Sequence, residues 1–232
     1  MKRTELVQQL DKAIADRNLL RHPFYRHWQA GTLRRESLQL YATEYYRHVE
    51  AFPGYLKVLA DRASGALRNL ILENLGDEED PAAPHPKLWR DFAAAVGVRE
   101  EVLWSSAPLY AVEVLVGTYQ EICREKPLAE AVAALYAYEA QVPEIATAKM
   151  EGLRRHYGVT KAQGVAYFKV HESADRVHRA AWRDWLEGNG TTATSAAQEM
   201  DEQGVLATAQ TALDALWGAL DAVQDAPMLG RT

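Results

Sequence analysis

Residues 161–187 read KAQGVAYFKVHESADRVHRAAWRDWLE, and this stretch decides the class of fold. Its apolar residues recur every three or four positions, which is the spacing of one face of an α-helix. The same periodicity runs through nearly the whole chain, and no alternating run typical of a β-strand bounded by turns appears. The sequence therefore predicts an all-α protein.

Short breaks rich in glycine, proline or small polar residues divide this helical pattern. We expect helices at residues 4–20, 34–62, 65–79, 85–97, 108–125, 128–157, 161–187 and 193–223, with a short helix at 22–30. No long linker or internal repeat interrupts the chain, so residues 1–232 are expected to form a single domain. Short turns favour antiparallel packing of neighbouring helices.

Two prolines, Pro53 and Pro143, lie inside these helical patterns. A proline within a helix cannot donate to the carbonyl four residues earlier, so both positions predict kinks. The bend at Pro143 either wraps the helix around the core or opens a cavity beside Glu139.

The composition excludes several classes of protein. The chain of 232 residues is 48% apolar, which supports a full-sized core. Its formal net charge of −6 shows no electrostatic footprint for nucleic acid. No apolar stretch approaches the roughly 20 residues that cross a bilayer, and the first residues lack the apolar core of a signal peptide. The single cysteine, Cys123, excludes an internal disulfide and a thiolate metal cluster, so we expect a soluble cytoplasmic protein without nucleic-acid or membrane partners.

The segment HESADRVH at 171–178 places three polar groups on one helix face. His171, Asp175 and His178 fall within a wedge of about 60°. Leaving such groups uncompensated in a core would cost several kcal/mol. This face therefore points either at water or at something that binds there.

Two other segments supply groups of the same kind. Glu139 lies in the apolar run AVAALYAYEAQV and needs a partner, which is either a bound ion or an arginine from another helix. In ENLGDEEDPAAPHP at 73–86, Glu78 and His85 lie at the junction of two helices, where both side chains can turn into one pocket. An acidic helix end of this type is also typical of a solvated, fraying terminus.

Together these segments contain three imidazoles and three carboxylates: Glu78, His85, Glu139, His171, Asp175 and His178. A mixed nitrogen and oxygen donor set without thiolates suits iron or manganese. Six ligands exceed what one ion with an open position needs, and fit two ions about 3.5–4 Å apart. The remaining histidines His22, His27, His48 and His156 are expected to be structural or exposed to solvent.

Tyrosine is unusually frequent, with eleven tyrosines against four phenylalanines. The helices expected around the pocket carry Tyr25, Tyr41, Tyr45, Tyr46, Tyr138 and Tyr167. Tyr167 lies one turn before His171, so its hydroxyl is expected to contact a metal ligand. Ordinary packing with satisfied hydroxyls explains any one of these residues equally well, but a tyrosine beside an oxidising metal centre is also an oxidisable group.

The spacing of the six candidate ligands resembles that of the haem-oxygenase-like dimetal oxidases, and within them the group around the Chlamydia protein associating with death domains. LLRHPFYRHWQAGTL at 19–33 and LQLYATEYYRHVEAFPGYL at 38–56 are also similar to that group. These two stretches resemble more distantly the pyrroloquinoline-quinone synthase and thiaminase-II-like proteins. The resemblance covers roughly residues 5–220.

This resemblance implies a homodimeric bundle of about seven to eight helices that binds two metal ions, iron or iron plus manganese, and uses dioxygen and an external reductant. It implies that the protein makes p-aminobenzoate, a folate precursor, from one of its own tyrosines. Tyr25 would be the sacrificed residue, unless the match at HPFY shifts by one residue onto Phe24. Tyr41 and Tyr138 would be neighbouring pocket tyrosines, and Lys149 the amino donor. Lys149 lies about 80° from the face of Glu139, so the bend at Pro143 would have to bring it inward.

Three other functions remain open at this point. The dimetal centre could act on an external small substrate, such as an amino acid or a fatty acid. A cofactor-free enzyme like the quinone synthase or thiaminase relatives would leave the six ligand-type residues without a role. An interaction protein is the non-enzymatic alternative, and no extended basic or apolar recognition segment in the sequence supports it.

Overall fold

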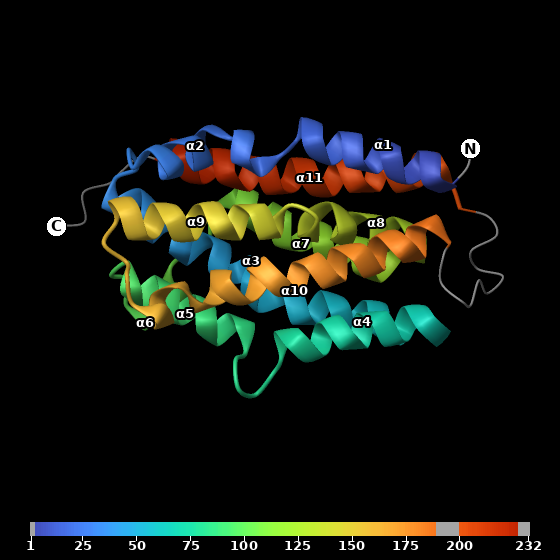
Figure 1. Ribbon diagram of the computed structural model, residues 1–232, viewed down its shortest axis with the longest axis horizontal. Coiled ribbons are helices and arrows are strands. Elements are labelled where there is room, and N and C mark those ends of the chain that lie inside the picture. The colour runs from blue at the N-terminus through green and yellow to red at the C-terminus, as the bar shows by residue number, and fades with distance from the viewer. Residues whose placement is uncertain (1–2, 189–199, 227–232) are drawn as a thin grey trace.

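Helix α10 (Ala162–Glu187) has nearly the bounds expected from its sequence and contacts α1, α4, α5, α8 and α9. The computed structural model describes residues 3–188 and 200–226. In Figure 1, α10 runs along the molecule between α8 and α9 on one side and α4 and α5 on the other. Its polar face therefore lies inside the bundle.

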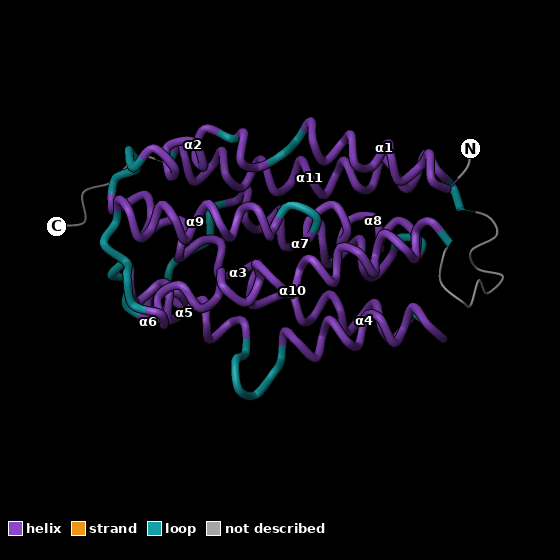
Figure 2. Tube along the Cα trace, in the orientation of Figure 1, coloured by secondary structure: helices purple, strands orange, loops and turns teal. Residues whose placement is uncertain are grey.

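The described residues form helices joined by loops and turns, and no strand occurs among them (Figure 2). This confirms the all-α fold, with more helices than the seven to eight expected. The elements are α1 (Arg3–Asp16), a 3₁₀ turn η1 (Leu19–Arg21), α2 (Pro23–Ala30), α3 (Arg35–Arg62), α4 (Gly65–Glu78), α5 (His85–Ala95), α6 (Glu100–Ser105), α7 (Tyr110–Glu125), α8 (Leu128–Glu139), α9 (Val142–His156), α10 (Ala162–Glu187) and α11 (Glu202–Asp225).

The helices lie roughly along one direction in successive layers (Figure 1). α1, α2 and α11 form one outer layer, α7, α8 and α9 lie beneath it, and α4, α5 and α6 form the opposite side. α3 is the longest helix and packs against α4, α5 and α7. The described helices share one hydrophobic core. None of them is long and apolar enough to span a bilayer.

The expected helix at 128–157 is wrong in one respect, because the chain forms two helices there. α8 ends at Glu139 and α9 begins at Val142, with Pro143 in the first turn of α9. A proline costs little at that position, since its missing N–H has no partner within the helix anyway. Pro143 therefore starts a helix rather than kinking one, whereas Pro53 does lie inside the continuous helix α3.

Other boundaries differ by smaller amounts. The short helix α6 was not expected from the sequence, and the first expected helix, 4–20, is divided into α1 and η1. α11 begins at Glu202 rather than at 193, and residues 193–199 lie outside the described part of the chain. His22 ends η1 and accepts a hydrogen bond from the amide of Phe24 through Nδ1, which confirms its structural role.

Candidate dimetal centre and tyrosine–lysine cluster

The first group of candidate ligands, which we call triad A, consists of Glu78, His85 and His171. Glu78 is the last residue of α4 and His85 the first residue of α5, so the connection between these helices brings both to α10. His85 Nδ1 lies 2.9 Å from Glu78 Oε2, and His171 Nε2 lies 3.9 Å from Glu78 Oε1. All three are buried, with donor atoms within 4.8 Å of one another.

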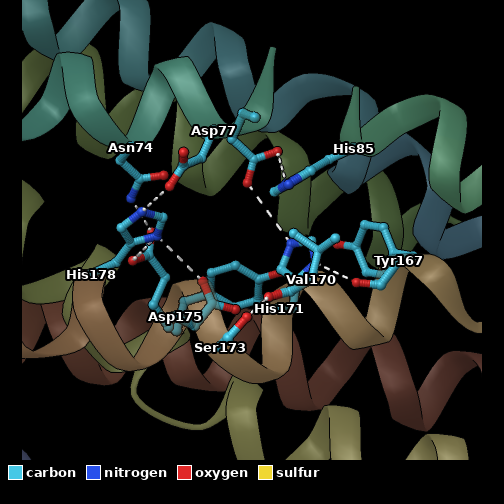
Figure 3. Close-up of polar contacts among 12 residues, drawn as sticks. Asn74, Asp77, His85, Tyr167, Val170, His171, Ser173, Asp175 and His178 are labelled. Atoms are coloured by element: carbon cyan, nitrogen blue, oxygen red, sulfur yellow. Dashed lines mark hydrogen bonds and ion pairs between the residues drawn. The ribbon is translucent and has the colours of Figure 1, made fainter. Parts of the chain in front are cut away.

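The second group, triad B, consists of Glu139, Asp175 and His178. His178 Nδ1 lies 3.5 Å from Asp175 Oδ1 and 3.8 Å from Glu139 Oε2. These residues are also buried and within 4.8 Å of one another. Because His171, Asp175 and His178 share one face of α10, the two triads are neighbours along that helix (Figure 3). Burial excludes the solvated-face interpretation of HESADRVH.

Buried contacts hold the candidate ligands in place. His171 Nδ1 lies 2.7 Å from the carbonyl oxygen of Tyr167 and must donate to it, which leaves Nε2 facing Glu78. Tyr167 thus contacts the ligand through its carbonyl and through its ring, which stacks on His171 at 4.1 Å, and not through the hydroxyl as expected.

Glu139 is held by two donors that the sequence analysis missed. Asn74 Nδ2 donates to Oε1 at 2.9 Å, and Trp182 Nε1 donates to Oε2 at 2.7 Å. The arginine partner considered for Glu139 is therefore wrong. Asn74 and Trp182 lie four residues from Glu78 and His178, so helical spacing from the candidate ligands is the signal that could have found them.

Burial and charge set the electrostatics of triad B. Burial, and next the charge of Asp175, raise the pKa of Glu139, and burial likewise raises the pKa of Asp175. Burial alone would lower the pKa of His178, but its hydrogen bond to Asp175 and the nearby carboxylates outweigh this and raise it to about 9. A region that disfavours its own negative charges in this way is stabilised by cations.

The residues present fit two metal ions. Asp175 Oδ2 is a buried atom with no hydrogen-bond partner among the described residues, and His85 Nδ1 lies 2.9 Å from Glu78 Oε2 without forming a well-aligned hydrogen bond. Each unsatisfied buried polar atom costs about 1–3 kcal/mol. Each triad supplies three nitrogen or oxygen donors, two imidazoles and one carboxylate in triad A and the reverse in triad B. This chemistry suits iron or manganese.

A second cluster, the tyrosine–lysine cluster, lies beside triad A and consists of the buried residues Tyr25, Tyr41, Tyr138 and Lys149 and the partly buried Tyr45. Lys149 Nζ donates to the Tyr41 hydroxyl at 2.6 Å, and the hydroxyls of Tyr25 and Tyr41 are 3.0 Å apart. The Tyr45 hydroxyl donates to that of Tyr138 at 3.2 Å. The structure thus brings together the tyrosines and the lysine that the resemblance implied, and adds Tyr45.

Lys149 reaches this cluster because α9 is a separate helix packed against α2 and α10. Trp28 Nε1 donates to the carbonyl of Lys149, and Gly152 allows this approach, since a Cβ there would lie 2.6 Å from Trp28 Cδ1. Burial lowers the pKa of Lys149 well below its usual value and raises the pKa values of Tyr25 and Tyr41. The cluster therefore favours a neutral amine among protonated phenols.

Two cavities border these clusters. The inner one has a volume of about 20 Å³ and is lined by residues that include Tyr25, Tyr45, Lys149 and His171. The outer one, of about 530 Å³, is open to solvent and reaches His85 between Asp77, Asp80 and Lys169. The inner cavity links the tyrosine–lysine cluster to triad A, and the outer one links triad A to the surface.

The chain is similar to known proteins over most of its length. Residues 39–217 match the family described as iron-containing redox enzymes. The chain is 39% identical to the 4-aminobenzoate synthase of Chlamydia pneumoniae over 94% of each chain. It is 28% identical to the pyrroloquinoline-quinone synthase of Granulibacter bethesdensis, covering 94% of this chain and 85% of the relative.

The fold also matches a solved structure. A TenA homologue from Pseudomonas syringae pv. tomato superposes with a TM-score of 0.78 at 17% identity, covering 95% of this chain and 91% of that one. The family match covers most of the chain and includes all six candidate ligands. The protein therefore belongs to the family of iron-containing redox enzymes with a haem-oxygenase-like fold.

Proposed function

We propose that this protein is a dimetal oxygenase that makes 4-aminobenzoate from its own Tyr25, with Lys149 as the amino donor. The observation that carries the proposal is the inner cavity of about 20 Å³ beside His171, lined by both Tyr25 and Lys149. A cavity of this size holds about one water-sized molecule. It accommodates a small reactant such as dioxygen, but not an external aromatic substrate, so the phenol rings within reach are those of the protein itself.

The six residues of triads A and B would hold two iron ions, or one iron and one manganese ion. Bound there, the ions would supply the redox chemistry that activates dioxygen with electrons from an external reductant. The carboxylates would balance the positive charge of the ions, and the imidazoles would direct their nitrogen atoms toward them. Contacts with Asn74, Trp182 and the Tyr167 carbonyl limit the movement of Glu139 and His171. The surrounding apolar core excludes bulk water from the reacting groups.

Lys149 has the properties that an amino donor needs. Burial lowers its pKa, which favours the neutral amine with a free lone pair. Nζ lies 5.2 Å from the centre of the Tyr25 ring and 2.6 Å from the Tyr41 hydroxyl. A neutral amine can accept a proton as well as donate one. The chain from the Tyr25 hydroxyl through the Tyr41 hydroxyl to Nζ can therefore carry the Tyr25 proton away during oxidation, and Nζ regains the lone pair needed for amino transfer once it releases that proton.

Tyr25 is favoured over Tyr41 as the sacrificed residue because it lines the inner cavity. Tyr41 lies between Tyr25 and Lys149 in the hydrogen-bonded chain, which suits a proton carrier. Phe24 has no hydroxyl to be replaced by an amine. Tyr138 and Tyr45 form a separate hydroxyl pair on the same cavity and would hold the site dry and aligned.

Isotope labelling tests the source of each product atom. Protein produced with ring-labelled tyrosine and ¹⁵N-lysine would be loaded with ferrous ion, with and without manganous ion, and given dioxygen and reductant without any substrate. We expect released 4-aminobenzoate to carry both labels, and mass spectrometry to locate the loss in the peptide that contains Tyr25. The Tyr25→Phe variant should release no product, whereas Tyr41→Phe should release it more slowly. Product that lacks the tyrosine label would refute the self-derived route.

A dimetal enzyme with an external substrate is the second candidate, and the outer pocket of about 530 Å³ beside His85 favours it. In that case the polypeptide would keep its mass after turnover with metal bound. A cofactor-free reaction would proceed without added metal. The proposal also includes a homodimer, which the family resemblance implies, in the cytoplasm, which the composition predicts. Sedimentation equilibrium would measure the oligomeric state.

A further inference from the structure

The two ring nitrogens of His178 face different carboxylates. Nδ1 faces triad B, 3.5 Å from Asp175 Oδ1 and 3.8 Å from Glu139 Oε2. Nε2 lies 3.0 Å from Asp77 Oδ2, on the penultimate residue of α4. Figure 3 shows His178 between Asp77 and Asp175. Asp77 is therefore joined to triad B without itself belonging to either triad.

This contact decides which nitrogen of His178 can bind a cation. An ionised carboxylate can only accept hydrogen bonds, so Asp77 requires the proton on Nε2. When a cation displaces the other ring proton, Nε2 keeps its proton toward Asp77 and the lone pair of Nδ1 faces Glu139 and Asp175. Without Asp77, the ring could place its proton on Nδ1 and donate it to Asp175 at 3.5 Å, which would block the position where a cation binds.

Triad A has the same arrangement with a different partner. There His171 Nδ1 donates to the carbonyl of Tyr167, and Nε2 faces the triad. That partner belongs to the backbone of α10 and cannot be removed by substitution. The partner of His178 is a side chain, with 58% of its surface exposed at the edge of the outer pocket. The orientation of His178 therefore depends on one accessible carboxylate.

We propose that Asp77 is a positioning residue for triad B: it holds His178 with Nδ1 toward Glu139 and Asp175, and so sets the affinity of the second metal ion. The inference rests on the dimetal centre of the proposed function. Loss of a carboxylate that orients a metal-bound histidine in this way typically weakens metal binding about 10–100-fold.

Three variants separate the effect of the hydrogen bond between Asp77 and His178 from the effect of the negative charge of Asp77. Asp77→Ala removes the acceptor, and Asp77→Asn retains an acceptor oxygen without the charge. Asp80→Asn removes one charge from the same pocket without touching His178, and its amide oxygen can still accept the hydrogen bond from the Ala82 amide. Each folded variant would be dialysed to equilibrium against ferrous ion under nitrogen, with bound iron measured by elemental mass spectrometry and folding checked by circular dichroism.

We expect the wild-type protein, Asp80→Asn and Asp77→Asn to bind two ions per chain. Asp77→Ala should bind one ion normally and the second about 10–100-fold more weakly. Two ions bound with unchanged affinity in Asp77→Ala would overturn the proposal. So would equal losses in all three variants, equal losses in the two Asp77 variants, or fewer than two ions in the wild-type protein. Two ions in the wild-type protein without labelled 4-aminobenzoate would refute the proposed function alone.

Discussion

Two neighbouring regions in the interior of the molecule differ in the charge state that their surroundings favour. Triads A and B contain three carboxylates and three imidazoles. The imidazoles do not fully compensate the negative charge of the carboxylates, and the pKa values of Glu139 and Asp175 are raised. The tyrosine–lysine cluster surrounds one lysine with aromatic rings, and burial there favours the neutral amine. Both regions are lined in part by α10, and the inner cavity lies between them.

Under the proposed function, this difference would divide one reaction between two regions of the same core. A region that is short of positive charge binds cations, which replace the protons its groups would otherwise retain. A region that keeps its groups neutral offers a nucleophilic amine and phenols that can be oxidised. Each region can be altered separately by substitution. Changes in the triads should affect metal binding, whereas changes in the tyrosine–lysine cluster should affect product formation without loss of metal.

The largest effect is expected from removing a ligand of triad B. Asp175→Ala should abolish binding of one metal ion and reduce formation of 4-aminobenzoate by about 100-fold or more, because a donor atom is lost from a three-residue set. Metal content and product would be measured together. Asp184→Asn, an exposed aspartate on the same helix, is the matched control and should retain both. Full product formation by Asp175→Ala would show that triad B is not needed.

Removing the amine should abolish the product without removing metal. Lys149→Met keeps the length of the side chain and fills the same apolar surroundings, so two ions should still bind while 4-aminobenzoate falls by about 100-fold or more. Elemental analysis and product assay of the same sample check this. Labelled product from Lys149→Met at the wild-type rate would assign the amino group to another source.

The two regions should also oppose each other in the pH dependence of stability. The pKa of His178 is raised from 6.5 to about 9. Its contribution to the free energy of unfolding is therefore complete below pH 6.5 and is lost as the pH rises through about 9. The raised pKa of Glu139 acts in the same direction from pH 4.5 upward. The lowered pKa of Lys149 acts in reverse, because the unfolded chain binds the proton more tightly, so stability is gained as the pH rises.

We therefore expect the metal-free protein to be less stable at pH 9 than at pH 6, by about 1–3 kcal/mol in the free energy of unfolding. Urea denaturation at both pH values measures this. The decrease should be steeper in Lys149→Met, where the opposing contribution is absent, and shallower in Asp175→Asn. A metal-free protein that gains stability over this range would contradict the assignment of charge to triad B.

The smallest effect concerns the helix contact that brings Lys149 inward. Gly152→Ala would place a Cβ 2.6 Å from Trp28 Cδ1, so overpacking should cost about 1–3 kcal/mol in the free energy of unfolding and move α2 relative to α9. Gly117→Ala has no atom within 4 Å of its new Cβ and should stabilise α7 by about 0.5–1 kcal/mol. Denaturant unfolding of both variants makes the comparison, and equal effects would show that the contact between Trp28 and Gly152 is loose.

Local patterns in the sequence were sufficient for most of the fold and for the candidate ligands. Periodicity predicted α3, α4 and α10 within one or two residues, because helix formation depends on neighbours three and four positions apart. The same spacing put His171, Asp175 and His178 on one face. The prediction failed where local signals are ambiguous. A proline can occur as a kink inside a helix or in the first turn of a helix, and Pro143 lies in the first turn of α9.

The sequence by itself determined the all-α class and a set of six candidate donors, and the family resemblance pointed to a tyrosine-rich pocket with Lys149. Only the tertiary structure decided that the donors divide into two triads, that Asp77, Asn74 and Trp182 hold them, and that the space beside Tyr25 is about 20 Å³. The physical reason is the separation along the sequence between the residues that interact. Helix periodicity is set by residues a few positions apart, whereas the contact between Lys149 and Tyr41 joins residues 108 positions apart and depends on how whole helices pack.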